Sequence, residues 1–142
     1  MVPGDQLNAV VGVPISAVIN VIIGAPEPNI GRTGRITCRY GAPVAGVYPL
    51  EISLNSYGSA QQAVERVTAT VTAAERRGVG SSTIAAGGVD GRYLPLPEGG
   101  LVVASSGIYS VAVSVAPNVL PPDQVPARAG SVAGIVLAQA GV

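Results

Sequence analysis

The chain contains no histidine, lysine, phenylalanine or tryptophan, and Cys38 is its single cysteine. Without histidine it lacks the usual general base, the Ser–His and Cys–His nucleophile pairs, and most zinc or iron ligand sets. Without lysine it forms no Schiff base, no Ser–Lys dyad and no phosphate-loop lysine contact. A lone cysteine makes neither an internal disulfide nor a metal site by itself. These absences predict a protein that is not an enzyme and that uses no metal or other cofactor.

Charge is also scarce, since charged residues make up 11% of the chain, against about a quarter in an average protein. Eight basic and eight acidic residues balance, so no long-range field attracts nucleic acid. Hydrophobic residues make up 48%, yet no run reaches the roughly 18 uninterrupted apolar residues that a membrane-spanning helix needs. We therefore expect a folded chain that neither spans a membrane nor binds nucleic acid.

Residues 1–142 suit a single domain, because the length allows a real core and no shift in composition marks a second unit. Hydrophobic periodicity predicts helices over 5–11, 59–77 and 123–141, and strands over 35–40, 48–57, 89–96, 101–104 and 108–116. Residues 15–23 are rich in β-branched side chains, which favours a strand, although a helix from Pro14 to Gly24 is the alternative. Loops are expected over 26–34 and 78–88.

The helix over 59–77 has the clearest signals. Ser59 is the expected N-cap, and Gln62 three residues later completes a capping box. Apolar residues then follow the 3.6-residue period and form one buried stripe. Gly78 suits the left-handed conformation that ends many helices.

In the last helix, Asp123 is the expected N-cap and Pro126 is tolerated in the first turn. Gly130 and Gly134 form a small-xxx-small pattern, which predicts close packing on the sheet or on a neighbouring helix. The three strands before this helix are joined by short turns, so they form an antiparallel meander. The sequence therefore predicts an α+β fold, in which an antiparallel β-sheet packs against two long amphipathic helices as a helix-flanked sandwich.

Four residues are candidates for a ligand-binding site: Tyr93, Tyr109, Arg35 and Arg39. Alternation along the strand over 35–40 places Cys38 on the core face, where it is a small hydrophobe, and the two arginines on the outer face. The arginines either hold an anion or are simply solvated. The two tyrosines are expected to be neighbours across the meander, where they either pack or line a ligand pocket.

The order of several short motifs is similar to that of a known group of domains. The motifs are Cys38-Arg39-Tyr40, the apolar strand at 50–54, the helix start Ser59-Ala60-Gln61-Gln62-Ala63, the Gly87-Gly88-Val89 turn, the strand at 108–113 and an alanine-rich last helix. The chain resembles small extracytoplasmic lipoprotein and sensor-type domains of actinobacteria, many of unknown function, and the wider PsbP/Mog1-like arrangement. That resemblance implies a cell-envelope location and peripheral membrane attachment through an N-terminal anchor that has been removed. Family members often have a second cysteine that pairs with the strand cysteine, and this chain lacks it.

Two functions remain open at this point. The first is a non-catalytic cell-envelope module that binds a small apolar ligand or a protein partner through a patch or pocket of tyrosine and small aliphatic side chains. The second is a cytoplasmic structural or assembly protein that acts through an oligomer interface. In the second case a homodimer would form through the small-residue face of the last helix or through a bare face of the sheet.

Overall fold

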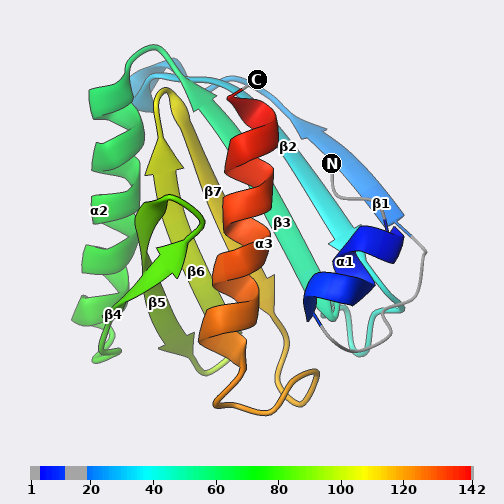
Figure 1. Ribbon diagram of the computed structural model, residues 1–142. Helices are drawn as coiled ribbons and strands as arrows, with labels where there is room; N and C mark the ends of the chain where they lie inside the picture. The colour runs from blue at the N-terminus through cyan, green and yellow to red at the C-terminus, as the bar shows by residue number, and fades with distance from the viewer. Residues whose placement is uncertain (1–3, 12–18, 142) are drawn as a thin grey trace.

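The computed structural model describes residues 4–11 and 19–141. Its middle layer is an antiparallel sheet of seven strands in the order β1-β2-β3-β7-β6-β5-β4 (Figure 1). The strands are β1 (Ile19–Gly24), β2 (Arg32–Tyr40), β3 (Leu50–Tyr57), β4 (Ser82–Ala86), β5 (Val89–Leu96), β6 (Gly99–Ser106) and β7 (Tyr109–Val115). The helices are α1 (Gly4–Val11), the short 3-10 helix η1 (Pro28–Ile30), α2 (Ala60–Arg76) and α3 (Val125–Ala140). The predicted α+β class with an antiparallel sheet is confirmed.

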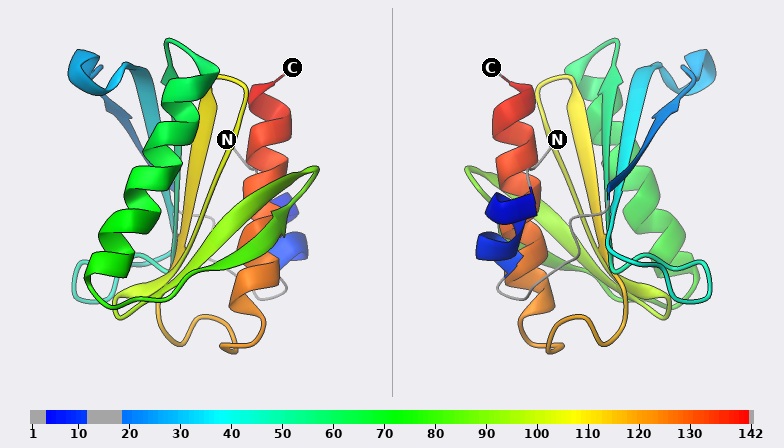
Figure 2. Two further views of the ribbon diagram at one scale, coloured as in Figure 1. Left: turned by 90° about the vertical axis from the view of Figure 1, so that its left-hand side faces the viewer. Right: turned by 90° about the vertical axis from the view of Figure 1, so that its right-hand side faces the viewer.

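Helices α2 and α3 cover opposite faces of this sheet (Figure 2). Successive side chains of a strand point to opposite faces, so Val102 packs in the core with α3 whereas Val103 packs in the smaller core with α2. Cys38 is only 2% exposed and belongs to the α3 core, as predicted. No helix among residues 4–11 and 19–141 has the length and apolarity needed to cross a membrane.

The signals at the start and end of α2 are confirmed in part. The Ser59 side chain accepts a hydrogen bond of 3.2 Å from the Gln62 backbone N–H, and Gly78 has φ +82°. The Gln62 side chain does not complete the capping box but lies against Gly31. The contact is so close that a Cβ added to Gly31 would overlap the Gln62 amide group. The first turn of α2 therefore packs against the turn that precedes β2.

The strand interpretation is confirmed for residues 19–23, with β1 extending to Gly24, and the part of that prediction over 15–18 lies outside the described residues. Two other predictions are wrong. The loop expected over 78–88 contains β4, which folds back on β5 through the Gly87-Gly88 turn. Its small residues show no hydrophobic alternation, so the pattern could not reveal it. Strand β2 begins at Arg32, inside the loop expected over 26–34, with a register shift before Gly34 that disguises the alternation.

The prediction that α3 is a second long amphipathic helix is not confirmed. Arg128 is its single charged residue, and its Nη1 donates a 3.1 Å hydrogen bond to the Val10 carbonyl of α1. Because α1 and the sheet both pack against α3, little of its surface is left for polar side chains. The N-cap is Gln124, without a side-chain cap, so the expected cap at Asp123 is wrong.

The close packing predicted for Gly130 and Gly134 is confirmed. Both glycines face the β4–β5 hairpin, and a Cβ added to either would overlap backbone atoms of residues 85–87. The small-residue face of α3 is therefore occupied within the same chain and is not free for a dimer contact.

Candidate anion-binding site

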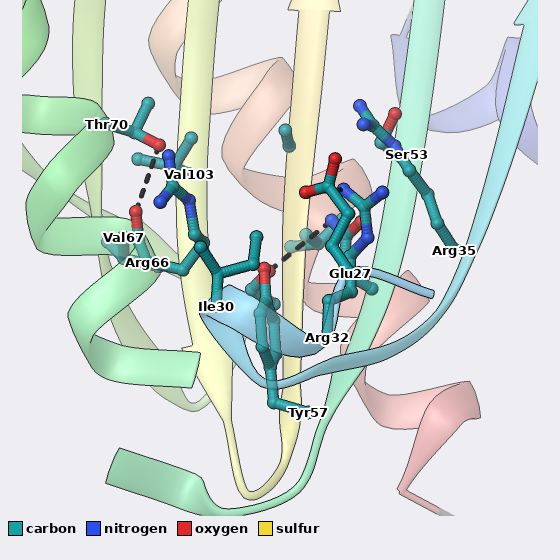
Figure 3. A pocket seen from close by; sticks show the side chains of 14 residues that line it. Glu27, Ile30, Arg32, Arg35, Ser53, Tyr57, Arg66, Val67, Thr70 and Val103 are labelled. Carbon is teal, nitrogen blue, oxygen red and sulfur yellow. Dashed lines mark hydrogen bonds and ion pairs between the residues drawn. The ribbon is translucent and has the colours of Figure 1, made fainter. Parts of the chain in front are cut away.

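A groove of about 410 Å³ lies on the α2 side of the sheet (Figure 3). One wall is α2 and the other is the segment that joins β1 to β2. The floor is formed by β2, β3, β6 and β7. Its lining residues are Glu27, Ile30, Arg32, Arg35, Ser53, Asn55, Tyr57, Arg66, Val67, Thr70, Val103, Ser110, Val111 and Ala112.

The floor is polar because the α2-side residues of the central strands β3 and β7 are polar. Ser53, Asn55 and Ser110 are 4%, 9% and 5% exposed, and burial of such groups is unfavourable unless they are hydrogen-bonded. Ser53 is satisfied by Thr37, with 2.9 Å between the two hydroxyl oxygens. The contacts from Asn55 Nδ2 to Ser110 Oγ and from Ser110 to the Tyr57 hydroxyl are both 3.5 Å, which is long for a hydrogen bond. This part of the floor is therefore only weakly bonded.

Three arginines enter the groove. Figure 3 shows Arg66 reaching in from α2, opposite Arg32 and Arg35 of β2. The Nε atoms of Arg32 and Arg35 are buried and have no hydrogen-bond partner in the part of the chain that the structure describes. The stem of Arg35 lies across Gly24, its cross-strand neighbour, with its Cβ 3.3 Å from the position of an added glycine Cβ. The Arg35 stem therefore lies flat against the sheet at Gly24.

Among the residues that the structure describes, Arg32 and Glu27 form the one ion pair within the groove. Arg32 Nη1 lies 3.5 Å from Glu27 Oε2, and Arg32 Nη2 donates a 3.2 Å hydrogen bond to the Ala25 carbonyl. The Arg32 side chain is 11% exposed and that of Glu27 is 51% exposed. Three guanidinium groups face one carboxylate, so the groove carries a net positive charge within a protein of zero net charge.

The four predicted site residues do not form one site. Arg35 lines the groove, but Arg39 donates a 3.0 Å hydrogen bond to Glu51 and lies 5.5 Å from the centre of the Tyr48 ring. Arg39 is therefore already engaged, and it does not line the groove.

The two tyrosines pack against the core on the α3 side. The expectation that they are neighbours is wrong, because Tyr93 lies opposite Val102 whereas Tyr109 lies opposite Ser106, four residues farther along β6. Tyr109 also lines a separate hollow of about 150 Å³.

Arg32, Arg66, Glu27 and Asn55 are absent from the sequence-based candidates. Arg66 lies on the exposed side of α2, and no pattern in the sequence shows that β2 faces it. The useful signal was the run of polar residues on the outward positions of β3 and β7. Helices α2 and α3 cover opposite faces of this sheet, so the outward positions of its central strands form a floor rather than solvent-exposed surface.

Two ionisable groups with perturbed pKa values lie outside the groove. Arg77 donates hydrogen bonds of 3.0 and 3.1 Å to the Glu98 carboxylate, and these bonds lower the pKa of Glu98 and raise the pKa of Arg77. Both side chains are more than half exposed, so the pair adds little to stability. Arg77 is therefore a suitable control for removal of an arginine outside the groove.

Within the described ranges, no group of three His, Cys, Asp or Glu residues could hold a metal ion. Comparison of the chain with family models, with curated proteins and with solved structures finds no match. The resemblance to lipoprotein and sensor-type domains therefore stays a prediction.

Proposed function

We propose that the protein is a non-catalytic binding module that holds a small anionic ligand in the groove between α2 and the β1–β2 segment. One observation carries the proposal: two arginines in the groove, Arg32 and Arg35, have buried Nε atoms without a partner among the described residues. A buried donor without a partner costs about 1–3 kcal/mol, and more when it is charged. Oxygen atoms of a carboxylate or phosphate would accept from these donors and balance the excess positive charge.

The size of the groove also supports a small ligand, because about 410 Å³ lies within the usual range for small-molecule sites. Its lining favours an anion over the apolar ligand that the sequence predicts, since arginine, serine, asparagine and tyrosine groups dominate it. The cell-envelope location belongs to this proposal through the resemblance alone.

The alternative function, assembly through an oligomer interface, has one observation in its favour. The edge strand β1 exposes Val21, Ile22 and Ile23, which are 57%, 38% and 79% exposed. Exposed apolar edge strands pair readily with other chains. Sedimentation velocity across a range of concentrations tests this alternative, since a monomer throughout would remove it.

Isothermal titration calorimetry at low salt tests the anion-binding proposal, with inorganic phosphate, pyrophosphate and citrate as probes. We expect saturable binding at one site that weakens as salt screens the arginines. The variant Arg77→Gln, which loses an exposed arginine outside the groove, should bind as the wild type does. Absence of saturable binding with all three probes would reject the proposal.

The variant Glu27→Gln is expected to bind phosphate about five-fold more tightly than the wild type. The Glu27 carboxylate occupies the groove beside Arg32 and repels an anion there. Removal of one like charge at the surface of a groove changes binding by about 1 kcal/mol, which corresponds to this ratio. Glu51→Gln is the matched control, because Glu51 pairs with Arg39 outside the groove. Equal or weaker phosphate binding by Glu27→Gln would place the anion elsewhere.

A further inference from the structure

Beside the arginine donors, the groove contains a buried hydrogen-bond acceptor, the side-chain oxygen of Asn55. Asn55 is 9% exposed, and its Oδ1 is buried without a hydrogen-bond partner in residues 4–11 and 19–141. Its Nδ2 points the other way, toward Ser110. A carboxylate, or the fully ionised phosphate of an organic monoester, cannot satisfy this oxygen, because neither group has a hydrogen to donate.

The sheet register places this acceptor directly beside the arginine that would hold the anion. Arg35 and Asn55 are cross-strand partners in β2 and β3, and Asn55 and Ser110 are partners in β3 and β7. Partners of this kind have Cβ atoms about 4.5–5.5 Å apart and point to the same face. Arg35, Asn55 and Ser110 therefore form a row along the floor of the groove. In succession they present a charged donor, a neutral acceptor and a hydroxyl group.

We infer that the ligand of this groove is a hydroxylated organic anion, such as a sugar phosphate or a polyol phosphate. This inference rests on the proposed function. The acidic group lies on Arg32 and Arg35, and a hydroxyl group a few bonds away donates to Asn55 Oδ1. Ser110 and Tyr57, whose mutual contact is 3.5 Å long, bind further hydroxyl groups.

The pair of glycerol 3-phosphate and propyl phosphate tests the inference, because both carry the same phosphate and three carbons but only one carries hydroxyl groups. By calorimetry we expect glycerol 3-phosphate to bind the wild type at least about ten-fold more tightly, which corresponds to one satisfied hydrogen bond of about 1.4 kcal/mol. In Asn55→Leu, which keeps the volume and removes the acceptor, the ratio should fall by about ten-fold, because only the contacts of other hydroxyl groups with Ser110 and Tyr57 remain. Asn55→Ser, which keeps an acceptor, should retain part of the preference and also serves if the leucine variant fails to fold.

The outcomes separate the two proposals. If both compounds bind the wild type equally, or if Asn55→Leu and Asn55→Ser keep the full preference, the inference is wrong and the anion site stands. If neither compound binds, the anion site itself is rejected.

Discussion

The variant Gly134→Ala is expected to destabilise the protein by about 2–3 kcal/mol, in the range seen for overpacked cores. A Cβ at this position would lie 2.5 Å from the Gly87 backbone nitrogen, 2.8 Å from its Cα and 2.9 Å from the Ala86 carbonyl carbon. All three are backbone atoms, so no flexible side chain can move aside. Gly87 also has φ +65° in the tight turn between β4 and β5, which limits how far the hairpin can shift.

The sign of this effect is informative. In a helix without such a contact, replacing glycine by alanine stabilises by up to about 1 kcal/mol. Urea unfolding of Gly134→Ala therefore distinguishes a glycine packed against the hairpin, which alanine destabilises, from a helical glycine without such a contact, which alanine stabilises. Gly88→Ala is the control in the same hairpin, because nothing lies within 4 Å of its added Cβ and its φ is not positive. A stabilised Gly134→Ala would contradict the packing of α3 on the hairpin.

The double variant Arg32→Gln, Arg35→Gln is expected to lose at least about 100-fold in phosphate affinity. A hydrogen bond to a charged group contributes about 1.5–3 kcal/mol, and two are removed together with two charges. Folding should be little affected, because a buried guanidinium with an unpaired Nε stabilises the free protein poorly. Calorimetry gives the affinity and urea unfolding gives the stability of the same sample.

If the double variant loses phosphate affinity but keeps its free energy of unfolding, the two arginines belong to a binding site. If the double variant keeps its phosphate affinity, the arginines do not hold the anion. If it unfolds, they are structural groups of the groove wall. Arg77→Gln should change neither quantity appreciably, since its partner Glu98 is exposed.

The sequence predicts the elements with strong local patterns. The α2 N-cap at Ser59, the core position of Cys38 and the glycine contacts of α3 follow from short-range rules that tertiary packing leaves intact. Strand β4 could not be predicted, because an edge strand of small residues has no hydrophobic alternation and is recognised only through its pairing with β5.

The candidate site was predictable only at Arg35. The other groove residues come from α2, β3, β6, β7 and the β1–β2 segment as well as from β2, and their convergence depends on sheet register and on the path of that segment. Alternation along the sequence places Asn55 and Ser110 at outward positions of their strands, but it does not show that β3 and β7 lie in the middle of the sheet. Because the strand order places β3 and β7 in the centre of the sheet, their outward residues form the floor of a groove. Local sequence patterns do not contain this strand order.

The most direct test of the anion site is a nuclear magnetic resonance titration that follows the arginine Nε–H signals of the ¹⁵N-labelled protein. The account predicts that addition of phosphate shifts the Nε–H signals of Arg32 and Arg35 in a saturable manner, because these two buried donors gain an acceptor. The signal of Arg77, already bonded to Glu98, should stay in place. If the signals of Arg32 and Arg35 do not move, or if all eight arginines shift alike, phosphate does not bind in this groove.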